Sequence, residues 1–134
     1  MNKVVKNILK ILSDDDFDLD KSRKFVNVKA IDPLKNLYKT QDIAVENNGY
    51  LVPVRIYYPY HEIPKEIKES DIANILLFFH GGGFVTESVD TYNRICRNLS
   101  KSTDAIVISV DYRLAPEFKF PIGLLDCYEV AKAL

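Results

Sequence analysis

Cysteine and histidine are scarce in this chain of 134 residues, which has two of each. Cys96 and Cys127 lie far apart and form no CxxC pair, and two histidines are too few for the usual zinc spacings. The sequence therefore predicts no zinc site. A reducing, cytoplasmic location is the expectation for such cysteine usage.

Long apolar runs and blocks of one charge are also missing. Eighteen basic and nineteen acidic residues leave a formal net charge of −1, and neither sign is concentrated as it is in proteins that bind nucleic acid or anionic membranes. The longest apolar run, ILLFF at 75–79, is far below the roughly 20 residues of a membrane-spanning helix. Lys6 and Lys10 interrupt the N-terminal apolar stretch, so no export signal is predicted there. We expect no nucleic-acid partner and no membrane span.

The hydrophobic content of 47% is enough for one core, and the chain is too short for two ordinary domains. The segments QDIAVE (41–46) and YLVPVRIYYP (50–59), separated by NNG, predict a β-hairpin, because Asn and Gly tolerate the positive φ of tight turns. Pro53 indicates that the second strand is bulged or has a free edge at that point.

Three other segments carry helical patterns. Residues 1–12 have apolar side chains at helical spacing and predict a short amphipathic helix. Residues 21–40 are ambiguous and predicted helical only in parts, because Pro33 interrupts any continuous helix. Residues 121–134 predict a final helix with Pro121 in its first turn.

The second half of the chain predicts a strand, a helix and a strand. Residues 72–79 are apolar without alternation, which is typical of a strand covered on both faces. Residues 88–102 carry Ile95 and Leu99 at helical spacing, and residues 105–111 form a second apolar run rich in β-branched side chains. This order implies a right-handed crossover and a parallel pair, whose following loops lie at the same carboxyl edge of the sheet.

Three consecutive glycines, Gly81, Gly82 and Gly83, follow the first of these strands. A dinucleotide-binding loop would need a further glycine where Thr86 stands. A loop that needs glycine only for close backbone packing is a second alternative. The third is an oxyanion hole, in which peptide N–H groups stabilise the negative charge that develops on an attacked acyl oxygen. The oxyanion hole explains the glycines best, because side chains would block the approach of the acyl group.

HGGGF at 80–84, DYRLAPE at 111–117 and FP at 120–121 together resemble the hormone-sensitive-lipase-like branch of the α/β-hydrolases, the bacterial and archaeal carboxylesterases. The resemblance spans roughly residues 41–134. It implies an α/β fold in which this range forms the N-terminal part of the hydrolase domain, with residues 1–40 as N-terminal cap helices. It also implies hydrolysis of carboxylic esters with short to medium acyl chains, without a metal or an organic cofactor.

The resemblance implies roles for individual residues. Gly82 and Gly83 supply N–H groups to the oxyanion hole, and Gly81 lets the loop turn. His80 braces the loop through hydrogen bonds and does not exchange protons with the substrate. Phe84 lines the acyl pocket or packs beneath it.

Five ionisable or nucleophilic side chains near this site are predicted to be structural. Asp111, Arg113 and Glu117 support the neighbouring glycine loop, because Arg113 can donate several planar hydrogen bonds to carbonyls or carboxylates. Asp126 and Cys127 are packing or surface residues, since no histidine neighbours them as a base.

The nucleophile, acid and histidine of the family's triad are not found in the sequence. No serine lies in a G-x-S-x-G motif, and no histidine follows His80. We therefore expect this chain to be the N-terminal portion of an esterase and to be inactive alone. The family's strand order, 1-2-4-3-5, would leave residues 75–79 as an uncovered apolar edge at which the chain can self-associate.

Two other interpretations remain open. One is a catalytically inert ligand-binding protein on a hydrolase scaffold, which binding of a small carboxylate without turnover would favour. The other is a nonfunctional gene remnant. The expected partner of the complete protein is a small-molecule ester.

Overall fold

The computed structural model describes residues 18–29, 40–59 and 74–134 of the chain. The helix predicted for residues 1–12 lies outside this part. Of the predicted cap range, 1–40, the structure describes mainly one helix, and the cap assignment stays a prediction. The elements are α2 (Leu19–Lys29), β1 (Thr40–Asn47), β2 (Tyr50–Tyr57), β3 (Ile75–Phe79), α3 (Asn93–Thr103), β4 (Ile106–Val110) and α4 (Ile122–Ala133).

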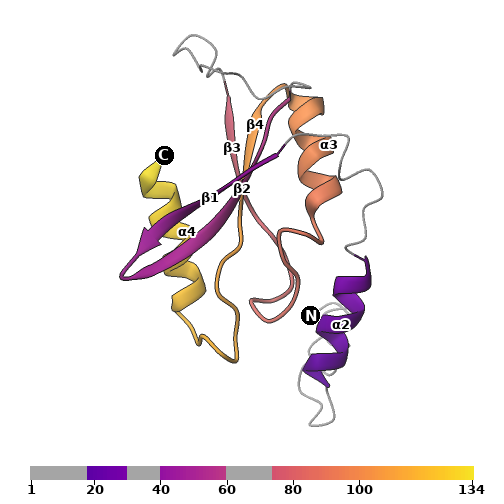
Figure 1. Cartoon of the computed structure of the whole chain (residues 1–134), viewed down its shortest axis with the longest axis vertical. Coiled ribbons are helices and arrows are strands. Elements are labelled where there is room, and N and C mark those ends of the chain that lie inside the picture. The colour runs from indigo at the N-terminus through magenta and orange to yellow at the C-terminus, as the bar shows by residue number, and fades with distance from the viewer. Residues whose placement is uncertain (1–17, 30–39, 60–73) are drawn as a thin grey trace, which may run out of the picture.

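The four described strands form one mixed sheet in the order β1-β2-β4-β3 (Figure 1). β1 pairs antiparallel with β2, β2 pairs antiparallel with β4, and β3 pairs parallel with β4. The hairpin and the parallel crossover predicted from the sequence are therefore confirmed. β3 occupies one edge of the sheet, and both of its ends, Ile75 and Phe79, are almost half exposed. Self-association through this edge remains a prediction.

The hairpin turns at Asn48 and Gly49, which both have positive φ. Asn47 is paired with Tyr50, so the loop has the two residues typical of a tight hairpin. Pro53 lies just outside the ladder between β2 and β4, whose first pair is Val54 with Val110. The Pro53 carbonyl accepts the Asp111 N–H at 2.9 Å, one position beyond that ladder, so this edge of β2 is not free and the predicted free edge is wrong. The missing N–H of Pro53 leaves this last pair with a single bond.

The two faces of the sheet carry separate apolar clusters, and β4 contributes to both. Val107 packs with Tyr57 and Cys96 on the face covered by α3. Ile108 packs with Val130 and its neighbours on the face covered by α4. Alternation along a strand sends successive side chains to opposite faces, so β4 joins the two halves of the core.

Of the two apolar residues that predicted α3, Leu99 packs against the cluster on the face that α3 covers and Ile95 does not. Ile95 is 51% exposed, while the buried positions of this helix include Asn93 and Ser100. Tyr57 donates a hydrogen bond of 2.8 Å to Asn93 Oδ1, and Ser100 donates one of 2.7 Å to the Ala105 carbonyl. Apolar spacing missed the polar part of this face, because Asn93 and Ser100 are buried with hydrogen bonds that satisfy their polar groups inside the core.

None of the helices in residues 18–29, 40–59 and 74–134 is long and apolar enough to cross a membrane.

Gly123 in the first turn of α4 gives a first testable prediction. Replacing a helical glycine by alanine ordinarily stabilises a protein by about 1 kcal/mol. Here the added Cβ would lie 2.6 Å from the Arg113 carbonyl oxygen, which is backbone and cannot rotate away. We expect Gly123→Ala to lower the free energy of unfolding by roughly 1–3 kcal/mol through overpacking, as measured by urea denaturation. An unchanged or higher midpoint would mean that α4 shifts without cost.

Candidate functional site

Two loops leave the sheet at the same edge. Residues 80–87, here called the glycine loop, follow β3, and residues 111–117 follow β4. Because β3 and β4 are parallel, both loops lie at their carboxyl ends, and α2 lies at the same end of the molecule (Figure 1). His80 Nε2 and Asp111 Oδ1 are 3.9 Å apart. The structure thus brings together the two motifs that the sequence singled out.

The backbone of the glycine loop is unusual. Gly82, Gly83, Phe84 and Glu87 all have positive φ, at 107°, 64°, 61° and 72°. Such angles suit glycine and are unfavourable for residues that carry a Cβ. The Gly82 carbonyl accepts hydrogen bonds from the N–H groups of Val85 at 3.1 Å and of Thr86 at 3.0 Å, which fold the loop into a tight turn.

The three glycines are needed for different reasons. A Cβ at Gly82 would overlap the Thr86 carbonyl, whereas a Cβ at Gly83 would have no atom within 4 Å. Gly81 has no positive φ, and a Cβ there would lie 2.7 Å from the Tyr92 hydroxyl. Gly81 therefore makes room for a neighbouring side chain, and its predicted role in letting the loop turn stays a prediction.

The N–H groups of Gly82 and Gly83 donate no hydrogen bond to any acceptor within the part of the chain that the structure describes. Gly82 is half-buried and Gly83 is exposed, so both donors can be reached from outside the fold. They are available to an external acceptor that carries negative charge.

His80 is buried and holds the loop from within. Its Nδ1 lies 2.8 Å from the Gly81 carbonyl oxygen, which can only accept, so this nitrogen carries the proton. The imidazole stacks on the Tyr112 ring at 4.2 Å between centroids, and the Tyr112 hydroxyl donates a bond of 2.6 Å to the His80 carbonyl. Burial raises the pKa of Tyr112 to about 12, so that hydroxyl stays a donor. These contacts support the bracing role predicted for His80.

The Arg113 side chain forms its hydrogen bonds with Asp126 and not with the glycine loop that it was predicted to support. Its guanidinium donates to the Asp126 carboxylate at 2.9 Å and 2.7 Å, and its backbone N–H donates at 3.0 Å. Asn47 adds a fourth bond to the same carboxylate at 2.7 Å. The hydrogen bonds of Arg113 and Asn47 to Asp126 thus attach the 111–117 loop to α4 and to the hairpin. Those of Arg113 do not reach the glycine loop.

Asp126 is fully buried, as its predicted packing role requires, although the sequence did not reveal its partner. Burial by itself would raise the pKa of Asp126, but the hydrogen bonds from Arg113 and Asn47 outweigh it and lower that pKa. The carboxylate is therefore ionised inside the protein, where its charge is compensated by Arg113.

Asp111 and Glu117 face a different way from Arg113. The Asp111 carboxylate accepts the Val89 N–H at 3.2 Å and remains 43% exposed. Glu117 forms a two-pronged ion pair with Arg23 of α2, with contacts of 2.6 Å and 2.9 Å. Hydrogen bonds from Arg23 lower the pKa of Glu117 to about 2, so this carboxylate is ionised at ordinary pH. Sequence reasoning did not identify Arg23 as part of this site.

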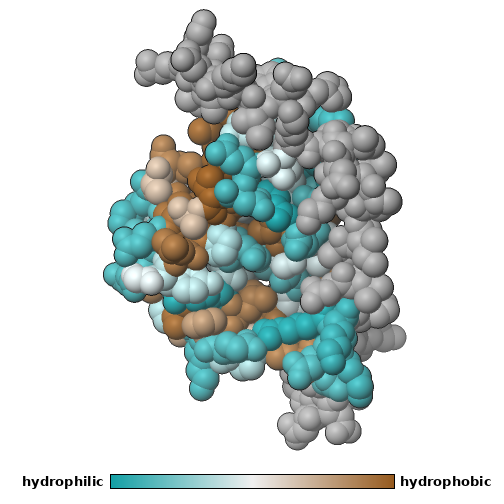
Figure 2. Space-filling model, viewed as in Figure 1, coloured by the Kyte–Doolittle hydropathy of each residue, from teal (hydrophilic) through white to brown (hydrophobic). Residues whose placement is uncertain are grey.

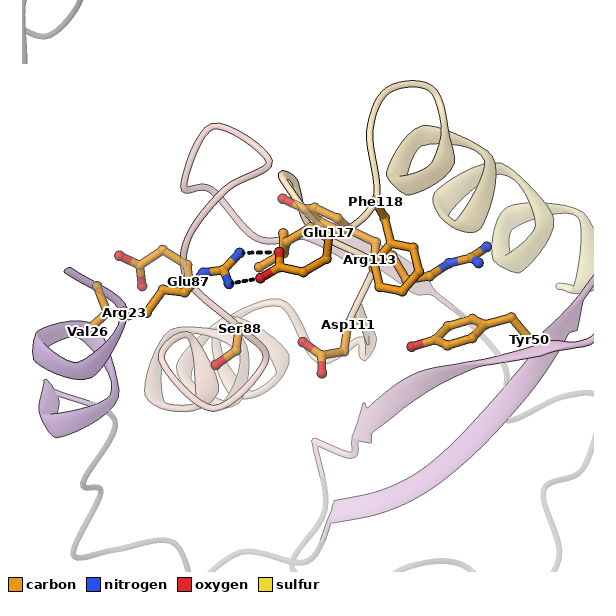
Figure 3. Close-up of a pocket in the computed structure, with 11 residues that line it drawn as sticks. Arg23, Val26, Tyr50, Glu87, Ser88, Asp111, Arg113, Glu117 and Phe118 are labelled. Atoms are coloured by element: carbon orange, nitrogen blue, oxygen red, sulfur yellow. Dashed lines mark hydrogen bonds and ion pairs between the residues drawn. The ribbon is translucent and has the colours of Figure 1, made fainter. Parts of the chain in front are cut away.

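A pocket of about 340 Å³ lies between α2, β2 and the two loops. Figure 3 shows Arg23 reaching from α2 to Glu117, while Tyr50 of β2 points toward Asp111. A second hollow, of about 290 Å³, is mainly apolar. Its lining includes Gly83, Phe84, Phe118, Phe120, Pro121 and Leu124.

Apolar surface extends from this second hollow over α4. Phe84 is 51% exposed, and Leu124 and Leu125 are about half exposed. Figure 2 shows apolar side chains gathered on the side of the molecule where α4 lies. Phe84 also contacts the Tyr112 ring, with centroids 5.2 Å apart. It therefore both packs against the 111–117 loop and lines the second hollow.

Comparisons with known proteins match this geometry. Residues 76–134 match a family model described as the alpha/beta hydrolase fold. An arylesterase of Saccharolobus solfataricus is 40% identical over 100 residues, which cover 75% of this chain and 30% of the relative. Esterase LipI of Mycobacterium tuberculosis is 36% identical over 100 residues, with the same two coverages of 75% and 30%.

A solved structure of an esterase from Pyrobaculum calidifontis has a TM-score of 0.72 and 33% identity, and the match covers 99% of this chain and 42% of that one. The match to the arylesterase and to LipI spans about 30% of the length of each of these two curated relatives.

Proposed function

Since this chain belongs to the hormone-sensitive-lipase-like branch of the α/β-hydrolases, we propose that it supplies the oxyanion-hole loop of a carboxylic ester hydrolase. The observation that supports this proposal most is that the N–H groups of Gly82 and Gly83 have no acceptor among residues 18–29, 40–59 and 74–134, and that they lie in a tight turn at the carboxyl edge of the sheet. Two relatives described as an arylesterase and an esterase are 40% and 36% identical to this chain over 100 residues, which supports the reaction class.

The chemistry follows from where charge develops. When a nucleophile attacks an ester carbonyl, the carbonyl oxygen becomes negative. Two N–H groups that are already fixed in place stabilise this charge without reorganising, and each such donor contributes roughly 10²–10³ in kcat. His80 keeps the donors in place through the Gly81 carbonyl and takes no part in proton transfer.

The acyl chain would lie in the apolar hollow beside Gly83, where Phe84 and Phe118 offer aromatic surface. A hollow of about 290 Å³ fits esters of short to medium chain length.

We expect the isolated chain to show no ester hydrolysis above background. The sequence contains neither a G-x-S-x-G serine nor a histidine after His80, so the two free N–H groups would act without a nucleophile. Purified residues 1–134 would be incubated with p-nitrophenyl acetate and butyrate.

Ser88→Ala is the matched control, because Ser88 lines the same pocket as Asp111 and is the described serine best placed to act as an unforeseen nucleophile. Turnover that disappears in this variant would contradict the proposal. Binding of a small carboxylate without turnover, measured by calorimetry, would favour the inert ligand-binding alternative instead.

A further inference from the structure

Arg23 uses its whole guanidinium to connect α2 with both loops. Nε donates to the Val85 carbonyl at 3.0 Å, and Nη2 donates to the Ala115 carbonyl at 2.8 Å. Nη1 and Nη2 also bind the two carboxylate oxygens of Glu117. The side chain is 25% exposed, so these bonds are partly shielded from water. Such a fork is specific to arginine, because lysine offers a single point of donation.

The bond to Val85 acts on the turn that holds the free donors. The Val85 carbonyl and the Thr86 N–H belong to one peptide unit, and this N–H donates to the Gly82 carbonyl at 3.0 Å. The Gly82 carbonyl in turn shares a peptide unit with the Gly83 N–H. A continuous series of hydrogen bonds therefore runs from the Arg23 cation through two peptide units to the Gly83 N–H.

Two properties of this series of hydrogen bonds affect the Gly83 N–H. Linked hydrogen bonds polarise one another, and a cation at the carbonyl end of a peptide unit makes its N–H a better donor. The turn also contains positive φ at Phe84 and Glu87, a conformation that persists only where surrounding contacts hold it. The bonds from Arg23 to Val85 and from the Ala115 N–H to the Phe84 carbonyl, at 3.0 Å and 2.8 Å, supply such contacts.

We propose that Arg23 is a positioning residue that orients and polarises the Gly83 N–H through the peptide units 85–86 and 82–83. This inference rests on the proposed function, because the Gly83 N–H is the donor that the oxyanion hole would use. It gives α2 a role in the chemistry of a loop that lies 62 residues away along the chain.

The test uses amide hydrogen exchange and amide chemical shifts of ¹⁵N-labelled residues 1–134, which require no catalysis. In Arg23→Ala, the Thr86 and Ala115 amides are expected to exchange roughly 10- to 100-fold faster, the range that a charge-assisted hydrogen bond contributes. The Gly83 amide proton is expected to shift upfield. Amides of β2 and β4 are expected to stay protected.

Lys21→Ala is the matched control, since Lys21 lies on the same helix and its ion pair with Asp18 is exposed. It is expected to leave the amides of the glycine loop unchanged. If the β2 and β4 amides of Arg23→Ala also exchange faster, the variant is unfolding more generally, and Arg23→Lys is measured in its place. Lysine keeps the charge but cannot bind Val85 and Glu117 together. Unchanged Gly83 and Thr86 amides in a folded Arg23 variant would overturn the inference.

Kinetics separates this inference from the proposed function. In an active hydrolase that carries this segment, Arg23→Ala is expected to lower kcat about tenfold with little change in KM, because the donor acts on the transition state. Altered Gly83 and Thr86 amides with unchanged kcat would contradict the oxyanion assignment, while Arg23 would remain the residue that orders Gly83.

Discussion

Replacing Gly82 by alanine is expected to lower kcat by roughly 10²–10³ in an active ester hydrolase that carries this segment. Gly82 has a φ of 107°, and an added Cβ would overlap the Thr86 backbone carbonyl, so the turn has to open. Gly83→Ala is expected to cost less. Its φ of 64° is accessible to alanine at a cost of about 1–2 kcal/mol, and the added methyl group would meet no atom within 4 Å. The structure thus separates two glycines that the motif alone treats alike.

The measurement is kcat with p-nitrophenyl butyrate, together with a thermal melt of each variant. Gly49→Ala in the hairpin turn is the matched control, because Gly49 has a φ of 83° and an added Cβ there would meet no atom of either loop within 4 Å. It should lower the melting temperature and leave kcat unchanged. A folded Gly82→Ala variant with full kcat would show that the oxyanion assignment is wrong.

Asp126→Ala is expected to lower the free energy of unfolding by roughly 3 kcal/mol, the low end of the range for breaking a buried ion pair. The substitution removes a fully buried carboxylate and leaves Arg113 and Asn47 without their shared acceptor. The low end applies because the Arg113 side chain is 16% exposed and retains some contact with water.

Urea denaturation measures this loss, and Glu129→Ala on the same helix is the control. Glu129 pairs with Lys132, whose side chain is 58% exposed, so the expected loss is small. A loss for Asp126→Ala no larger than the loss for Glu129→Ala would mean that water replaces the buried carboxylate at little cost.

Features encoded by neighbouring residues were predictable from the sequence. The NNG turn at 47–49 predicted the hairpin because positive φ is a local requirement, and the apolar run at 105–111 predicted a strand. The glycines at 81–83 were recognisable because few structures need bare backbone at a strand end. The order of the strands came from the family resemblance, since no local pattern specifies which strands pair.

Features that depend on distant contacts were not predictable. Arg23 binds residues that lie 62 to 94 positions further along the chain, and nothing around it distinguishes it from an exposed arginine. Arg113 was expected to hold the glycine loop, but the carboxylate of Asp126 is a stronger partner than a neutral carbonyl. Sequence reasoning identified the two loops correctly and could not identify the residue that connects them.

The cluster of Asn47, Arg113 and Asp126 joins the hairpin, the loop after β4 and α4, and it links residues 79 positions apart. Closing so long a loop costs entropy before the contact contributes anything. We therefore expect the contact between Asn47 and Asp126 to form late in folding. Interactions that are absent from the folding transition state slow unfolding and leave the folding rate nearly unchanged. On this expectation, the buried carboxylate of Asp126 prolongs the lifetime of the native chain, which the unfolding rate of Asp126→Ala would measure.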